Sequence, residues 1–339
     1  MNIPYRTRRL LKTAGIILLI LLLAATLVYL CWFLWLQRYV VYTRDQGAVI
    51  NMDQSPHIAD GQAAVEPEQE TVSIYYNEGE NAINTGRELT QLIGYYANEE
   101  LLADMALVKQ QISLLPSGTP VMLDVKDGKG RFFYSSAISA ERRSSIDPAA
   151  MDELIAQLDK KGMYLIARLP AFRDYSFGLS HTENGLFVAS GAYLWADEDY
   201  CYWLDPTKQG TVTYLVEIIT ELKKLGFDEV VFEDFCFPNA DNLKFSGDRA
   251  VALNTTATTL VTTCADERFT VSFVGGAPGF TLPEGRCRLY MTDVAAIQAA
   301  TVAAESGIDD PVIRLVFLTD IHDTRFNEFS VLRPLDSAG

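Results

Sequence analysis

The sequence predicts an α/β protein whose main domain is a (β/α)8 TIM-like barrel. Short apolar runs alternate with stretches of helical spacing over about 250 residues, which is the length that eight β/α units require. An open doubly wound sheet would usually show a Gly-rich phosphate loop after its first strand, and the sequence has none. The last unit is too short for a full helix, so we expect the barrel to be irregular at its C-terminal seam.

Composition and charge exclude several classes of function. The chain has 339 residues and a formal net charge of −16, which disfavours nucleic acid as a partner because phosphate binding needs a basic surface. Its three histidines lie far apart, and no Cys/His cluster has ligand spacing. We therefore expect neither a metal nor another cofactor. No Ser-His-Asp spacing and no phosphate loop support an esterase or a kinase.

The N-terminal segment predicts a membrane anchor. Residues 1–13 form a basic cytoplasmic tail, and residues 14–36 contain no charged side chain. At ~1.5 Å per residue, a helix over 14–36 is long enough to cross the hydrocarbon core of a bilayer. Because the basic flank comes first, we expect a single-pass cell-membrane protein with a cytoplasmic N-terminus and an extracytoplasmic C-terminal domain. The alternative, a cleaved signal peptide, would have a shorter apolar region and a small-x-small site.

Residues 37–85 are predicted to be an acidic, flexible linker between the anchor and the domain. They contain many carboxylates and few large apolar side chains, and Pro56 and Pro67 interrupt any periodicity. The pattern changes at about residue 86, and we assign residues 86–339 to the barrel domain.

The alternation within the barrel domain can be followed element by element. Eight strands are predicted, at residues 92–96, 120–125, 164–167, within 226–238, and at 269–274, 288–291, 311–316 and 329–332. Helical spacing predicts helices at 101–115, 148–158, 211–225, 248–264 and 294–304. Asp147 is expected to cap the second helix, with Pro148 at its first position, and Asp293 is expected to cap the last.

The fourth strand carries the most informative residues. It is followed by two adjacent carboxylates, Glu233 and Asp234, and then by the aromatic residues Phe235 and Phe237. Burying carboxylates is costly unless they are paired or used. Carboxylates at the C-terminal end of a barrel strand, beside aromatic rings, are typical of a sugar-processing site. The alternative is a strand that merely ends in polar residues at the surface.

Four motif runs in this region together resemble a known family. They are Val121 to Asp127 with Gly130 and Tyr134, Tyr164 to Arg168 with Phe172 and Asp174, Trp203 to Pro206, and Gly226 to Pro238. In this order they resemble a family of bacterial extracellular TIM-barrel domains whose glycoside hydrolase activity is inferred from their fold. The resemblance implies a barrel that acts on glycans. It covers about residues 90–240, and we match no motif in residues 241–339.

The sequence departs from the family at the end of the fourth strand. The family usually reads Phe-Asp-Tyr-x-Arg-Phe-Pro, where this chain has Glu233 for the Asp, Asp234 for the Tyr and Cys236 for the Arg. A carboxylate is kept with a longer reach, and the cation is lost. This change would fit an altered specificity or a barrel that binds sugar without cleaving it.

Glycoside hydrolysis needs two carboxyl groups, one of which is protonated near neutral pH. We expect Glu233 to be the general acid, with Asp234 as a neighbour that raises its pKa. Adjacent strand residues point to opposite faces, so only one of the two enters the barrel unless the strand has ended. The second carboxylate is then Asp124 or Asp127 on the second strand. The alternative for these two is a structural ion pair with Lys126 or Arg168.

Substrate contacts are expected from polar and aromatic residues around this site. Arg168 could bind a uronate or orient a carboxylate, or it could form a buried ion pair at the barrel mouth. Aromatic faces suit the C–H surfaces of sugars. The expected substrate-binding residues are Lys126, Arg168, Tyr193, Trp195, Trp203, Asp234 and Phe235.

These inferences together predict a membrane-anchored, extracytoplasmic glycoside hydrolase that acts on cell-envelope or environmental polysaccharide by carboxylate acid/base catalysis. The expected partner is a polysaccharide or the glycan of peptidoglycan. The alternative function is a non-catalytic carbohydrate-binding or cell-wall scaffold barrel.

Four cysteines outside the anchor allow disulfides. Cys201 and Cys236 are expected near the C-terminal ends of strands, and Cys264 and Cys287 at the opposite end of the barrel. A strand separates the two ends by more than the ~7 Å limit between bridged Cα atoms. Only the pairs Cys201 with Cys236 and Cys264 with Cys287 are therefore compatible with the fold, and four free thiols are the alternative.

Overall fold

The structure is a computed structural model that describes residues 88–138 and 145–335, together with Thr26, Trp32, 40–43 and 47–50. The predicted basic tail lies outside these residues, as do nearly all of the predicted anchor and most of the predicted linker. Among the residues described, none of the helices has the length and apolar character that crossing a bilayer requires.

The chain divides into two compact units, Met1–Glu78 and Gly79–Gly339. Within the first unit, strand β1 (Val40–Thr43) pairs with β2 (Gly47–Ile50) in antiparallel register. All further description concerns the second unit.

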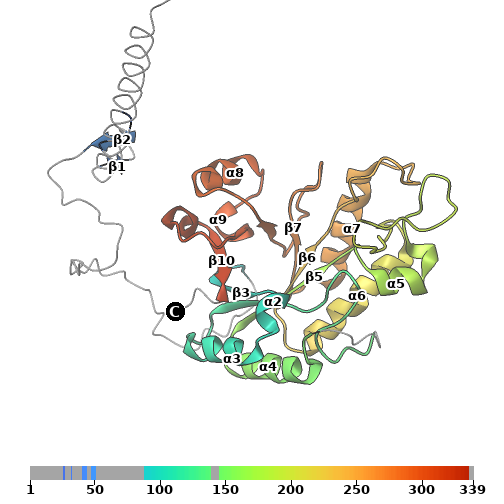
Figure 1. Ribbon diagram of the computed structural model, residues 1–339, viewed down its shortest axis with the longest axis horizontal. Coiled ribbons are helices and arrows are strands. Elements are labelled where there is room, and N and C mark those ends of the chain that lie inside the picture. The colour runs from blue at the N-terminus through green and yellow to red at the C-terminus, as the bar shows by residue number, and fades with distance from the viewer. Residues whose placement is uncertain are drawn as a thin grey trace, which may run out of the picture. The chain divides into compact units, whose positions relative to one another are not determined.

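The second unit is a closed barrel of eight parallel strands, which confirms the predicted fold class. The strands lie at the centre of the unit, with helices α3, α4, α6 and α7 outside them (Figure 1). The order around the barrel is β10-β3-β4-β5-β6-β7-β8-β9, so the last strand closes on the first. The strands are β3 (Ile93–Ala97), β4 (Pro120–Asp124), β5 (Tyr164–Pro170), β6 (Glu229–Glu233), β7 (Thr270–Val274), β8 (Leu289–Met291), β9 (Leu315–Leu318) and β10 (Ser330–Pro334).

The helices are regular in the first half of the barrel and short in the second. They are α2 (Glu99–Leu102), α3 (Met105–Leu114), α4 (Pro148–Lys160), α5 (Tyr175–Ser180), α6 (Gln209–Lys224), α7 (Arg249–Cys264), α8 (Ala299–Glu305) and α9 (Pro311–Arg314), with 3-10 turns η1 (Thr182–Asn184), η2 (Ala296–Gln298) and η3 (Thr324–Glu328). The connection 275–288 between β7 and β8 contains no helix, and only η3 links β9 to β10. The expected irregular seam is therefore present.

Two sequence predictions near this seam are wrong. Residues 311–314 form helix α9 and not strand, because Pro311 occupies the first helical position, where its fixed φ and missing N–H are favourable. Asp293 does not cap a helix: α8 begins only at Ala299, and Asp293 instead has a left-handed φ of 56° just after β8. A short apolar run does not by itself distinguish strand from helix.

Helix α4 illustrates how well-signalled elements form as predicted. The Asp147 side chain accepts a hydrogen bond from the N–H of Ala149, and Pro148 stands at the start of the helix. The apolar side chains recur at helical spacing on one buried face, which comprises Met151, Leu154, Ile155 and Leu158. That face packs into the main core between the helices and the outside of the barrel strands.

The barrel interior is layered from polar to apolar to polar. Side chains alternate along each strand, so that Glu229, Val231 and Glu233 of β6 share the inward face. The middle layer is apolar and consists of residues such as Met122, Ile166 and Val231. Glu229 begins the strand below this layer, and Glu233 ends the strand above it. The same inward face therefore places one carboxylate at each end of the barrel.

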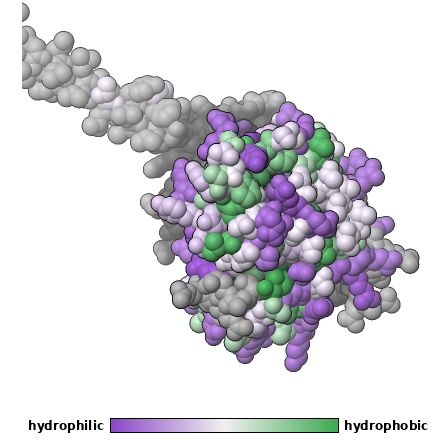
Figure 2. All heavy atoms as spheres, turned by 90° about the vertical axis from the view of Figure 1, so that its right-hand side faces the viewer, coloured by the Kyte–Doolittle hydropathy of each residue, from purple (hydrophilic) through white to green (hydrophobic). Residues whose placement is uncertain are grey.

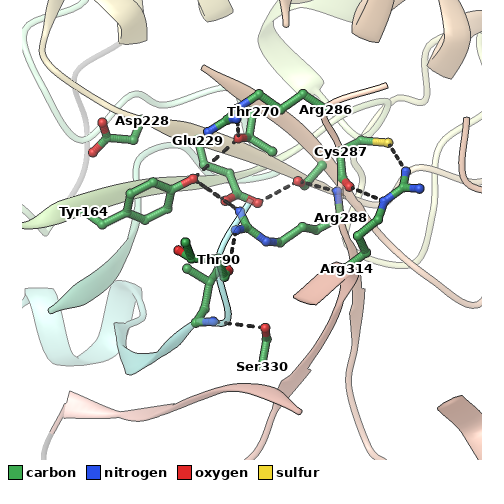
Figure 3. Close-up of polar contacts among 12 residues, drawn as sticks. Thr90, Tyr164, Asp228, Glu229, Thr270, Arg286, Cys287, Arg288, Arg314 and Ser330 are labelled. Atoms are coloured by element: carbon green, nitrogen blue, oxygen red, sulfur yellow. Dashed lines mark hydrogen bonds and ion pairs between the residues drawn. The ribbon is translucent and has the colours of Figure 1, made fainter. Parts of the chain in front are cut away.

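A buried ion pair occupies the N-terminal end of the barrel (Figure 3). Arg288 Nη1 donates to Glu229 Oε2 at 2.5 Å, and both side chains are buried. The Glu229 carboxylate also accepts hydrogen bonds from the hydroxyls of Tyr164 (2.9 Å), Ser272 (2.6 Å) and Tyr290 (2.9 Å). Every lone-pair direction of the carboxylate therefore has a donor, which is the condition under which a buried charge is tolerated.

The Arg288 guanidinium carries this network across the barrel seam. Its Nη2 donates to the carbonyl of Thr90 at 2.9 Å, and its Nε donates to the carbonyl of Ile313 at 3.2 Å. Thr90 precedes β3, the first barrel strand, and Ile313 precedes β9. One side chain therefore ties the fourth, first and seventh strands of the barrel together. We use the name Glu229 network for the Glu229 carboxylate and the four side chains that donate hydrogen bonds to it, which are Tyr164, Ser272, Arg288 and Tyr290.

We predict that Glu229→Gln destabilises the protein by about 3–5 kcal/mol, because it leaves the Arg288 charge buried without a counter-ion. The double variant Glu229→Gln/Arg288→Met should recover part of this loss. Urea unfolding of the purified chain measures both free energies. As a control, Glu153→Gln removes the exposed ion pair with Lys109 and should cost less than about 1 kcal/mol. Equal costs for Glu229→Gln and Glu153→Gln would contradict the proposed role of the network.

Candidate functional site

A second charged layer lies at the opposite end of the barrel, where the strands end. It consists of Tyr96, Asp124, Arg168 and Glu233, which we call the rim layer. Asp124 ends β4 and Glu233 ends β6, while Arg168 lies on β5 between them, in register with Asp124. Parallel pairing brings these strand ends to one edge, which is where active sites of TIM barrels are built.

Arg168 joins the two carboxylates of the rim layer. Its Nε lies 2.6 Å from Asp124 Oδ1, and its Nη2 donates to Asp124 Oδ2 at 2.9 Å, so that pair is bidentate. The same Nε lies 3.6 Å from Glu233 Oε2. The Tyr96 ring lies 5.9 Å from the guanidinium. Arg168 therefore forms the ion pair with Asp124 that sequence analysis held as the structural alternative.

Glu233 combines a raised pKa with access to solvent. Burial raises its pKa from 4.5 to about 7, the Asp124 and Asp234 charges add to this rise, and the Arg168 guanidinium opposes it. Its side chain is nevertheless 36% exposed. A carboxyl group that is protonated near neutral pH and also reaches solvent is able to donate a proton to a bound ligand.

The backbone at Asp234 places two adjacent carboxylates in one cavity. Asp234 has a left-handed φ of 51°, so the extended conformation of β6 stops at Glu233. Because the alternation of strand side chains ends there, both Glu233 and Asp234 line a cavity of about 590 Å³, which we call the Glu233 cavity. Burial raises the pKa of Asp234 as well. Asp234 therefore remains a candidate for contact with a ligand.

Asp124 and Asp127 have different hydrogen-bond and ion-pair partners. Asp124 is occupied by Arg168, and its Oδ2 also accepts the N–H of Glu99 at 2.9 Å. Asp127 forms an ion pair with Arg131, and its Oδ1 accepts the N–H groups of Lys129 and Arg131 at 2.9 Å each. Asp127 thus organises a turn. It is not among the residues that line the Glu233 cavity.

Lys126 is placed where no ligand reaches it from solvent. Its side chain is fully buried, with Nζ 2.8 Å from Asp174 Oδ2. Asp174 in turn accepts a hydrogen bond from the Tyr214 hydroxyl at 2.8 Å and caps α5. The structure therefore gives Lys126 a structural role in holding α5 and α6, not the predicted contact with substrate.

The predicted aromatic contacts fall into two groups. Trp195 and Trp203 line the Glu233 cavity, with ring centroids 6.5 Å apart. Trp203 Nε1 donates to Asp197 Oδ2 at 3.1 Å, which fixes its ring. Phe235 is buried against Phe172 and Phe273 and forms part of the cavity wall. Tyr193 lies in a neighbouring hollow described below.

Asp293, which the sequence suggested only as a helix cap, lines a cavity at the open end of the barrel. A second cavity of about 700 Å³ at the same barrel end is lined by residues that follow β8 and β9, including Asp293 and Asp320, and we call it the β8–β9 cavity. It shares Arg168 and Thr292 with the Glu233 cavity. The available signal was an aspartate just after a barrel strand, the same signal that identified Asp234.

The four cysteines are free thiols in the structure, so neither predicted disulfide is present. Cys287 Sγ lies 3.0 Å from the carbonyl of Pro283 and accepts a hydrogen bond from Arg314 Nη2 at 3.1 Å. Cys201 Sγ lies 4.0 Å from the carbonyl of Asp199. Four free thiols were the stated alternative to the two possible disulfides, and the structure agrees with that alternative.

Solved structures similar to this one share low sequence identity with it. A hypothetical protein from Ruminiclostridium thermocellum ATCC 27405 is 21% identical with a TM-score of 0.46, and the match covers 53% of this chain and 96% of that chain. An alpha-galactosidase from Geobacillus stearothermophilus (12%, TM-score 0.47) and a chitobiase from Flavobacterium johnsoniae (8%, TM-score 0.47) match over 74% and 69% of this chain. This chain covers only 40% and 38% of those two enzymes.

No curated protein matches the sequence. A family match does exist: residues 96–272 match the family described as "Putative glycosyl hydrolase domain". This span is more than half of the 339 residues and contains all four motif runs quoted above, from Val121 to Pro238. It also contains Asp124, Arg168 and Glu233 of the rim layer. The chain belongs to this family of putative glycosyl hydrolase domains.

Proposed function

We propose that the barrel is a glycoside hydrolase in which Glu233 is the general acid. The observation that carries the proposal is a carboxyl group with a pKa of about 7 that lines an aromatic-walled cavity at the C-terminal end of a barrel. Glycosidic cleavage needs such a group to protonate the leaving oxygen. The family to which the chain belongs supports this class of reaction.

Three residues of the rim layer, Glu233, Arg168 and Asp124, would take part in the proton transfer. Glu233 donates its proton to the glycosidic oxygen as the bond from that oxygen to the anomeric carbon breaks. The resulting carboxylate lies 3.6 Å from Arg168 Nε, whose positive charge stabilises it. Asp124 holds Arg168 through two hydrogen bonds, so it acts as a positioning residue. Hydrolysis is complete when the oxygen of a water molecule bonds to the anomeric carbon and one proton of that water is taken up by a carboxylate of the pair, after which Glu233 is protonated again.

We assign the opposing carboxylate to Asp293. It lies at the end of β8, which is separated from β6 by β7 alone. Neighbouring strands are ~4.8 Å apart, so the backbones of β6 and β8 are separated by about 10 Å. Side chains on strands this far apart can come within the ~5–10 Å separations that glycosidases use, and the β8–β9 cavity, which Asp293 lines, shares Arg168 and Thr292 with the Glu233 cavity. The left-handed φ of Asp293 matches that of Asp234, and such backbone outliers cluster at functional sites.

We predict that Glu233→Gln lowers kcat/KM by about 10²–10⁴-fold, because it removes the proton donor at nearly constant volume. In the unmodified protein kcat/KM should fall as the pH rises through about 7, since only protonated Glu233 is active. The measurement is the pH profile of hydrolysis of a panel of aryl glycosides and polysaccharides. Retained activity in Glu233→Gln would reject this residue as the acid.

The same pKa predicts a pH dependence of stability. The folded state holds a proton on Glu233 up to about pH 7, whereas the unfolded chain loses it near 4.5. The folded state therefore binds more protons in this window, and the free energy of unfolding should fall as the pH rises from 4.5 to 7. In Glu233→Gln this contribution should disappear, as urea unfolding at several pH values would measure. An identical slope in both proteins would contradict the raised pKa.

Asp124 and Asp293 should respond differently to mutation. Asp293→Asn should lower kcat/KM by at least about 100-fold at every pH. Asp124→Asn removes a negative charge near Glu233 and frees Arg168, so both effects lower the pKa of Glu233 and should move the fall in activity to lower pH. Asp320→Asn, which changes the same cavity as Asp293, is the matched control. Loss of activity in Asp124→Asn across the whole pH range would return the catalytic role to Asp124.

The second candidate function is a carbohydrate-binding barrel without catalysis. The observation that favours it is the direct pairing of Arg168 with Asp124 inside the rim layer, which leaves one carboxylate neutralised. In this case the protein would bind polysaccharide and release no reducing ends, and Glu233→Gln would bind as well as the unmodified chain.

We also propose that residues 14–36 anchor the barrel to the cell membrane, with the N-terminus in the cytoplasm and the barrel outside. The proposal rests on the uncharged run and its basic flank. Removing residues 1–44 should release the protein into the soluble fraction, since the long apolar run lies before that point. Cell fractionation with a salt wash is the measurement, and a truncated protein that stays with membranes would reject this topology.

A further inference from the structure

A third space, distinct from the β8–β9 cavity, lies beside the Glu233 cavity and is lined mostly by the segment between β5 and α6. Its volume is about 740 Å³, and its walls include Leu179, Tyr193, Trp195, Asp197, Tyr200 and Asn242. We call it the outer hollow. Trp195 and Asp197 also line the Glu233 cavity, so the two spaces share a wall. A ligand bound at Glu233 could therefore extend into the outer hollow.

Large apolar side chains are exposed in this hollow. Tyr193 is 66% exposed, Tyr200 is 78% exposed and Leu179 is 51% exposed. Within the described part of the barrel unit, Tyr193 and Tyr200 are the only exposed tyrosines. Tyr200 also has a left-handed φ of 59°, which is unfavourable for a bulky residue. The chain thus keeps an aromatic ring in solvent at a cost in backbone energy, which is typical of a functional position.

The hollow stands on a rigid support. Asp197 accepts hydrogen bonds from Arg173 Nε at 2.6 Å and from the N–H of Cys201 at 2.9 Å. Trp195 Nε1 donates to Asn242 Oδ1 at 3.1 Å. Antiparallel bridges join Phe187 to Leu194 and Ala196 to Tyr202, so the segment is held as a folded ribbon. The backbone of the segment that carries the two tyrosines is thus preorganised, which reduces the entropy lost when a ligand binds.

The chemistry of the lining favours a neutral sugar chain. Aromatic faces pack on the C–H surfaces of sugar rings, and Asn242 and Thr182 offer hydrogen-bonding groups at the edge. Asp197 is the one charged residue of the lining, and Arg173 neutralises it. The hollow therefore lacks the unpaired cation that a polyanion would need. Figure 2, which views the unit from the side of α5 and α7, shows hydrophobic and hydrophilic residues interleaved over the coloured part of that face.

We propose that the outer hollow is a distal sugar-binding subsite, in which Tyr193 and Tyr200 stack against residues of a neutral polysaccharide whose scissile bond lies at Glu233. The proposal rests on the function proposed above, and it makes an extended polysaccharide the preferred substrate over a short glycoside. The polysaccharide would pass from one space to the other along the wall that Trp195 and Asp197 form in both.

The test measures binding apart from cleavage. The full chain carrying Glu233→Gln is compared with the same chain that also carries Tyr193→Ala and Tyr200→Ala, by affinity electrophoresis in soluble neutral glucan, xylan and mannan. We expect the tyrosine changes to weaken binding to the preferred polysaccharide by about tenfold, since they remove both exposed rings on which sugar residues would stack. Polygalacturonate, a polyanion, should not be retained by either protein.

Val251→Ala and Ile297→Ala remove exposed apolar side chains away from the hollow and should leave binding unchanged. Thermal unfolding checks that all variants fold. Equal binding with and without the two tyrosines would overturn the subsite, and so would the absence of binding to every neutral polysaccharide tested.

Kinetic measurements distinguish the subsite from the proposed hydrolase activity, on which the subsite rests. In the chain with Glu233 intact, the tyrosine changes should raise KM for the polysaccharide and leave the hydrolysis of a short aryl glycoside unchanged. Cleavage with unchanged KM for the polymer would overturn the subsite and keep the hydrolase. Binding that depends on the tyrosines, in a protein that cleaves nothing, would keep the subsite and reject the hydrolase.

Discussion

The buried pair of Glu229 and Arg288 is the constraint on which the rest of the barrel depends. A closed barrel must join its first and last strands, and here the segments near the seam are short helices and a 3-10 turn, which pack on a small apolar cluster that includes Phe317, Phe326 and Phe329. Arg288 reinforces the seam by binding Glu229 on the fourth strand and backbone carbonyls next to the first and seventh. Removing either charge would leave the other unpaired in the interior, so the network fixes the arrangement of strands as well as stabilising it.

One strand face shows how environment decides what a carboxylate does. Glu229 and Glu233 point inward from β6 and are separated by the apolar Val231. Glu229 receives three hydroxyl donors and a guanidinium, so it is held as part of the framework. Glu233 lies 3.6 Å from a guanidinium that is already bound to Asp124, and burial raises its pKa to about 7. The framework at one end thus positions a titratable group at the other.

Arg168 organises the open end of the barrel. It lines the Glu233 cavity and the β8–β9 cavity, and it also faces a smaller hollow beside Asp124. Its charge therefore reaches all three of these spaces. The family motif that the fourth strand resembles would place an arginine where this chain has Cys236. Arg168 places a cation next to Glu233 from the neighbouring strand, although Cys236 itself supplies none.

The barrel could be predicted from the sequence alone, because the alternation of strands and helices, the cap at Asp147 and the carboxylates where β6 ends are local signals. It also singled out Glu233, Asp234 and Arg168. Only the tertiary structure decided which groups are paired. The ion pairs of Asp124 with Arg168, Lys126 with Asp174 and Glu229 with Arg288 join separate strands and helices. The left-handed turn at Asp293 depends on the fold around it, so the sequence suggested a helix cap there. Secondary-structure propensity depends on residues that are close in the sequence, whereas burial and charge pairing arise only when distant segments come into contact.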